Sequence, residues 1–132
     1  MDVGSIQVHA LHKLKKIFQK DPNSLIEWYL ADSEKKLQAL YLAIEKNSVK
    51  EKLSLLKELR NMSTDIGAIP FSYLCLSIEM AISEYRLINL VRAWHVLKTS
   101  HEQLKENLLQ LHQDLTPPER PINNLAQIAN GP

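Results

Sequence analysis

The chain has 132 residues, of which 45% are hydrophobic and 23% are charged, and its formal net charge is +1. A chain with so little net charge lacks the positive electrostatic potential that attracts nucleic acid or an anionic membrane. No apolar run approaches the roughly 18 residues of a membrane span. Its single cysteine, Cys75, excludes an intramolecular disulfide, and its first residues lack the pattern of a signal peptide. We therefore expect a cytoplasmic protein.

The first half of the chain predicts three helices. Apolar residues at three- and four-residue spacing predict a helix over about 5–20, with Ser5 as its cap. Asp21 and Pro22 stop it, and Ser24 is expected to cap a second helix over about 24–46. The third covers about 49–66, and Gly67 after it is the expected terminal residue with positive φ.

The second half predicts two further helices and a tail. Pro70 suits the first turn of a helix over about 70–84, and positions 90 to 111 give a regular apolar stripe to a helix over about 86–113. Pro117, Pro118 and Pro121 then end helical structure. We expect a helical domain over 1–115, an all-α, antiparallel up-down four-helix bundle with an additional short N-terminal helix, and a flexible tail over 116–132.

Familiar catalytic motifs are missing from the sequence. No glycine-rich phosphate loop, CxxC or HExxH occurs, and no spacing marks a catalytic triad. His9 and His12 lie one turn apart, yet solvated surface histidines outweigh a metal site there, because a tight site needs more ligands. Cys75 on an apolar helix is expected to be a buried, inert thiol, and His101 to sit at the bundle edge with one ring nitrogen satisfied. We expect no metal and no cofactor.

The segment from Leu56 to Ala68 resembles the signature of histidine-containing phosphotransfer (HPt) domains, loosely A-H-x-L-K-G-S-S-x-x-I-G-A. Its matching positions are Leu59, Ser63, Ile66, Gly67 and Ala68, and Arg60 keeps the basic character. The stretch from Leu74 to Glu79 resembles the L-C-x-x-L-E of the next helix in that family, and Tyr29 to Asp32 resembles F-L-E-D upstream. The resemblance covers roughly residues 10–112 and implies an HPt-like bundle.

The departures from the family lie at its active position. Lys57 stands where the family has its histidine, and Asn61 stands where it has a glycine that lets a receiver domain approach. A neutral imidazole can accept a phosphoryl group, whereas a lysine amine is protonated at pH 7 and is not nucleophilic. The resemblance therefore implies a degenerate site, formed by Lys57, Arg60, Asn61, Thr64 and Glu79. Equal distance from the turn at Gly67 predicts an ion pair or a close approach between Lys57 and Glu79, with Arg60 flanking it.

Three functions remain open on the sequence. The resemblance implies a non-enzymatic, monomeric pseudo-HPt module, which docks on a response-regulator receiver domain or a histidine kinase without carrying phosphate. The alternative is a helical-bundle interaction protein unrelated to phosphorelay, with Lys57 and Arg60 on an ordinary solvated helix face. The third is active phosphotransfer through His95, which lacks the surrounding motif.

Overall fold

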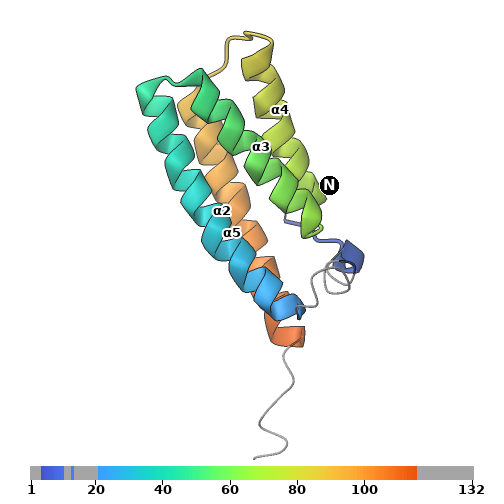
Figure 1. Ribbon diagram of the computed structural model, residues 1–132. Coiled ribbons are helices and arrows are strands. Elements are labelled where there is room, and N and C mark those ends of the chain that lie inside the picture. The colour runs from blue at the N-terminus through green and yellow to red at the C-terminus, as the bar shows by residue number, and fades with distance from the viewer. Residues whose placement is uncertain (1–3, 11–12, 14–20, 116–132) are drawn as a thin grey trace, which may run out of the picture.

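The computed structural model describes residues 4–10, 13 and 21–115. Four long helices run through it in chain order: α2 (Pro22–Lys46), α3 (Val49–Asp65), α4 (Ile69–Ser83) and α5 (Leu90–Leu115). Successive helices run in opposite directions, so they form an up-down bundle (Figure 1). The described part of the chain contains no strand, and the predicted all-α fold class is confirmed. No described helix has the length and apolar character needed to cross a membrane.

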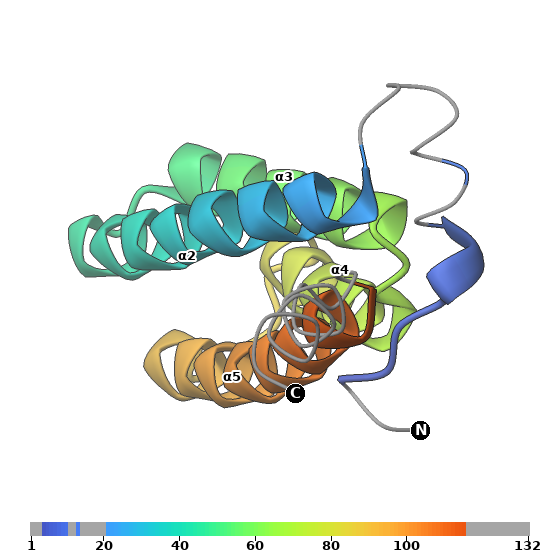
Figure 2. The same ribbon diagram turned by 90° about the horizontal axis from the view of Figure 1, so that it is seen from below.

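The predicted apolar stripes meet in one core. Seen from below, α2 packs against α3 and α5, and α4 likewise packs against α3 and α5, so α3 and α5 are diagonal to each other (Figure 2). The side chains of Tyr29, Leu59, Phe71 and Leu97, one from each helix, are fully buried. Five of the seven stripe positions of α5 are buried and the two outermost are partly buried; the apolar positions agree with the prediction, and His101 is more buried than expected. Burial of these stripes is the main force that holds the helices together.

Two helix beginnings differ from the prediction because other residues cap them. The Asp21 carboxylate accepts a hydrogen bond from the Ser24 amide at 2.9 Å, so α2 starts at Pro22 and Ser24 is not its cap. The last helix starts at Leu90 instead of residue 86, because the Asn89 side chain accepts from the Arg92 amide at 3.0 Å. Tyr85, with φ 56°, turns the intervening loop away from helical geometry.

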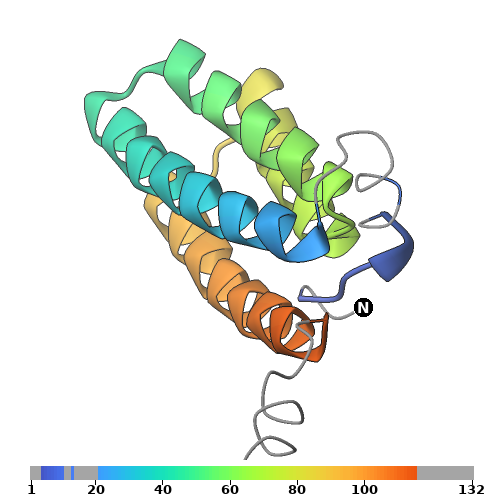
Figure 3. The same ribbon diagram turned by 60° about the horizontal axis from the view of Figure 1, so that its bottom comes forward.

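The turn between α3 and α4 is built around Gly67. Its φ is +87°, as expected, and the Ala68 amide closes the turn on the Ser63 carbonyl at 2.8 Å. The Gly67 carbonyl accepts from the Gln7 amide at 2.7 Å, and a Cβ on Gly67 would collide with the Gln7 backbone. Residues 4–10 thus lie across this end of the bundle (Figure 3).

The N-terminal segment is also fastened to α5. The Asn107 side-chain amide donates to the Gly4 carbonyl at 2.8 Å, and Ile6 packs against the core. Residues 8–10 and 13 are helical, in agreement with a short first helix, but residues 5–7 are not, so the predicted start at Ser5 is wrong. The rest of that helix, His12 included, and the predicted tail over 116–132 lie outside the described residues. No group of three metal-binding side chains occurs within the described ranges.

Cys75 lies on the buried face of α4 and has no exposed surface. Burial raises the pKa of its thiol to about 12, and since the thiolate is the reactive form, the thiol is inert at neutral pH. We expect a thiol reagent such as 5,5′-dithiobis(2-nitrobenzoate) to label the native protein at pH 7.5 at least about 100-fold more slowly than the urea-unfolded protein. Equal labelling rates in the two states would contradict this burial.

Candidate functional site

The five residues of the predicted degenerate site lie on α3 and α4, the two helices that flank the Gly67 turn. Lys57, Asn61 and Thr64 are exposed, whereas Arg60 and Glu79 are partly buried between the helices. The four site residues of α3 are spaced by three and four positions along the helix, which places them on one face of it. The face is polar and contains no histidine.

Arg60 and Glu79 form a two-bonded ion pair across the two helices. Arg60 Nε lies 2.8 Å from Glu79 Oε2, and Arg60 Nη2 lies 3.3 Å from Oε1. The side chains are 25% and 17% exposed, so the pair is shielded from much of the solvent. Its hydrogen bonds raise the pKa of Arg60 above the ordinary value. This fork geometry fixes both side chains and is stronger than a single contact.

The predicted ion pair between Lys57 and Glu79 is therefore wrong. Across the described residues, no carboxylate lies within 4.0 Å of the Lys57 ammonium, and Arg60 takes the position beside Glu79. Side chains on a helix lean toward its N-terminus. In antiparallel helices, Arg60 on α3 and Glu79 on α4 consequently lean toward each other, while Lys57, one turn earlier, leans past the pair. The prediction used only the distance of each residue from the turn and did not include the direction in which the side chains lean.

Hydroxyl groups join α3 to α4 next to the ion pair. Ser72 Oγ donates to the Arg60 carbonyl at 3.1 Å, Thr64 Oγ1 lies 2.9 Å from the same carbonyl, and the two hydroxyls are 2.6 Å apart. Two hydroxyl protons serve three contacts, so at most two of these bonds exist at once. The cluster fixes how the two helices align beside Arg60. The sequence analysis missed Ser72, and a serine in the first turn of α4 gave little signal for it.

The three histidines of α5 lie away from this face. His101 is 3% exposed, inside the core instead of at the bundle edge, and its Nε2 lies 2.7 Å from Ser33 Oγ. Burial lowers its pKa. His95 is exposed on α5, where its ring lies 5.1 Å from that of Trp94. His112 Nε2 lies 3.0 Å from Glu27 Oε1. None of these rings is placed among the predicted site residues.

A shallow groove of about 540 Å³ lies between α2 and α3, next to this face. It is lined by the apolar residues Ala39, Leu42 and Leu55 and by charged residues of both signs, among them Lys50 and Glu58. Leu42 is 55% exposed. Ser54 and Glu58, which line the groove, lie about one turn before Lys57 and Asn61 on α3, so the groove and the polar face are neighbouring parts of one surface.

Comparisons with known proteins agree with the fold. No protein-family model matches the chain, and no curated protein matches it significantly. Among solved structures, histidine-containing phosphotransfer protein B (HptB) from Pseudomonas aeruginosa PAO1 superposes with a TM-score of 0.74 over 84% of this chain and 96% of that one. The two sequences are 15% identical, so the likeness is one of fold. The bundle is HPt-like, as the sequence resemblance implied.

Proposed function

We propose that this protein is a non-catalytic pseudo-HPt module of phosphorelay signalling. It would dock on a response-regulator receiver domain or a histidine kinase without carrying phosphate. The observation that carries the proposal is an HPt-like bundle whose α3 presents Lys57, Asn61 and Thr64 to solvent but no histidine. Receiver binding would use this polar face together with the groove between α2 and α3.

The chemistry of the site supports binding and argues against transfer. An aspartyl phosphate is attacked by an unprotonated nitrogen, and the lysine ammonium has no free electron pair at neutral pH. The Arg60 guanidinium is occupied by Glu79 and stays protonated. Lys57 is the exposed cation of this face, and it can approach the acidic pocket of a receiver as a point charge.

Binding is tested with purified receiver domains from the same cytosol, with and without beryllofluoride, a stable mimic of the aspartyl phosphate. We expect Lys57→Glu to weaken binding at least about tenfold, because a charge of the wrong sign then faces the receiver. Arg92→Glu reverses an exposed charge on α5 and is the matched control, with binding unchanged. Absence of binding to every receiver and kinase would favour an interaction protein outside phosphorelay.

Phosphoryl transfer is tested separately with a radiolabelled phospho-receiver. We expect no acid-labile label on the wild-type protein, because Lys57 cannot accept the group, and partial labelling of Lys57→His at most, because Asn61 still occupies the approach. Wild-type labelling that disappears in His95→Ala would establish the active alternative instead. Labelling that survives replacement of His95 would point to another histidine, and it would equally refute the non-catalytic proposal.

A further inference from the structure

The loop between α4 and α5 displays apolar side chains that the bundle does not use. Tyr85 is 91% exposed, Leu87 fully exposed, Ile88 39% and Val91 45%. We call these four residues the loop-end surface. Single exposed leucines are common, but a group of four such residues within seven positions is typical of a binding surface.

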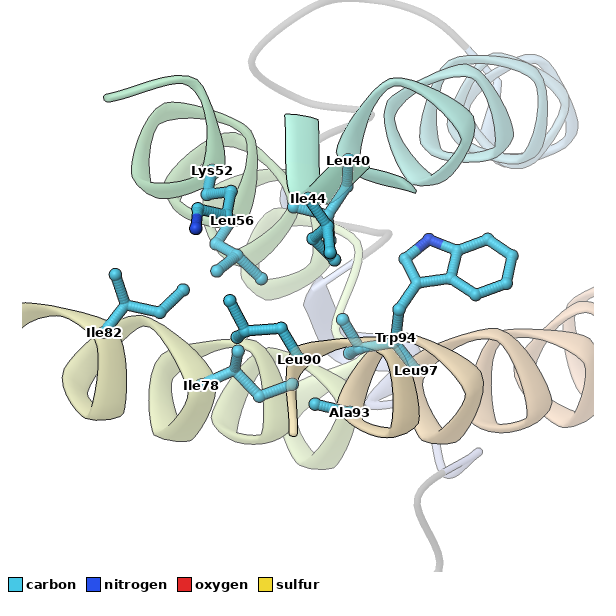
Figure 4. Close-up of a pocket in the computed structure, with 10 residues that line it drawn as sticks. All are labelled: Leu40, Ile44, Lys52, Leu56, Ile78, Ile82, Leu90, Ala93, Trp94 and Leu97. Carbon is cyan, nitrogen blue, oxygen red and sulfur yellow. The ribbon is translucent and has the colours of Figure 1, made fainter. Parts of the chain in front are cut away.

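An apolar cavity lies beside this surface, between the ends of all four helices (Figure 4). Ile82 and Leu90, the residues on either side of the loop, line it together with Ile44 and Leu56. The enclosed space has room for about one water-sized group. The cavity walls are almost entirely hydrocarbon, and Lys52 contributes the charged group.

Lys52 is 3% exposed although it carries an ammonium group. Its Nζ donates to Asn47 Oδ1 at 3.1 Å, which is a neutral partner. Within the described ranges, no carboxylate lies within 4.0 Å of it. Burial of a charge is costly unless an opposite charge compensates it. The carboxylate of a partner would therefore gain more binding free energy beside Lys52 than beside an ordinary surface lysine.

The charged residues around the loop also favour a partner that carries carboxylates. Residues 45–52 and 83–92, which form this end of the bundle, contain five cations and three carboxylates. One of those carboxylates, Glu84, is already paired with Arg86 at 3.0 Å. The end therefore combines exposed hydrocarbon with an excess of positive charge, and a partner must complement both.

We propose that the loop-end surface docks an amphipathic helical segment of another protein, whose apolar side chains cover Tyr85, Leu87 and Ile88 and whose carboxylate faces Lys52. The polar face proposed for receiver docking lies on another side of α3, although Lys46 and Lys50, which are counted in the charge excess, also line the groove between α2 and α3. Lys52 and Lys57 are five residues apart on α3, which places them about 140° apart around the helix. A segment bound here leaves the face of Lys57, Asn61 and Thr64 free.

The probe for this site is a fluorescein-labelled helical peptide of leucine and glutamate, compared by anisotropy with a peptide in which glutamine replaces every glutamate. We expect the glutamate peptide to bind the full chain at least about tenfold more tightly. Lys52→Met keeps the length and apolar stem of the side chain, and it should reduce that preference to less than about threefold. Leu87→Ser should weaken the binding of both peptides at least about fivefold. Leu109 on α5 is 48% exposed and lies outside the loop-end surface. Leu109→Ser should therefore leave the binding of both peptides unchanged.

Several results would overturn the proposal. Equal binding of the two peptides, or no binding of either, would contradict the proposal of a partner that presents a carboxylate. Concentration-dependent dimerisation that Leu87→Ser abolishes would show that a second copy covers the surface. Binding to vesicles of phosphatidylserine that Leu87→Ser abolishes would assign it to a membrane. Circular dichroism of each variant separates these outcomes from unfolding, and receiver binding by the same variants tests the other site independently.

Discussion

Replacing Phe71 by alanine is expected to lower the free energy of unfolding by about 3–5 kcal/mol. Phe71 has no exposed surface, and its ring lies 5.8 Å from the His101 ring in the centre of the bundle. The substitution removes a large, fully buried apolar group and leaves a cavity in the core, which the packed helices close only in part. Urea denaturation at pH 7, followed by circular dichroism, measures the change.

The control for this substitution is on the same helix. Tyr73 is 60% exposed, so Tyr73→Ala removes a similar aromatic group without opening the core. We expect its effect to stay within about 0.5 kcal/mol. Equal losses in the two variants would mean that alanine at these positions acts through the helix itself, and it would contradict the central place of Phe71 in the packing.

Stability is expected to fall as the pH drops below about 6.5, the ordinary pKa of histidine, because His101 is buried in its neutral form. Burial lowers the pKa of His101 in the folded state. Below 6.5 the unfolded chain binds a proton that the folded chain does not, so the unfolding free energy declines by up to about 1.4 kcal/mol per pH unit until the folded-state pKa is reached. Above 6.5 this histidine is neutral in both states and contributes no slope.

The comparison of wild type with His101→Gln isolates this contribution. Glutamine keeps a neutral hydrogen-bonding group for Ser33 but does not titrate, so its stability should change less between pH 6.5 and 5. The surrounding charges of Glu34, Lys98, Glu102 and Lys105 are the same in both proteins, and their titration cancels in the difference. Parallel pH profiles of wild type and variant would exclude His101 as the source.

The fold was predictable because it rests on periodic burial. The stripes predicted for α2, α3, α4 and α5 became buried helix faces, and Gly67 marked the turn, because few other residues adopt a positive φ without strain. The misplaced boundaries come from the capping side chains of Asp21 and Asn89. Caps are local hydrogen bonds, and two candidates only three residues apart, such as Asp21 and Ser24, cannot be ranked by spacing alone.

The grouping of the candidate-site residues was predictable from the sequence, but their contacts were not. Sequence spacing brought Lys57, Arg60 and Glu79 to one region, and the structure places Arg60 beside Glu79. Which cation reaches a carboxylate depends on the lean of the side chains and on the alignment of the helices, which the hydroxyls of Thr64 and Ser72 help to set. The buried position of His101 was hidden for a similar reason, because its partner Ser33 is 68 residues away.

The bond between Gly4 and Asn107 has a consequence for the order of folding. It joins residues 103 positions apart, whereas the turns between successive helices join near neighbours. Contacts of large sequence separation form slowly because the chain between them must first be ordered. Closure of the N-terminal segment over the α3–α4 turn should therefore be the last native event. The amide proton of Gln7, bonded to the Gly67 carbonyl, should acquire its protection from exchange with solvent only after the helix amides have acquired theirs.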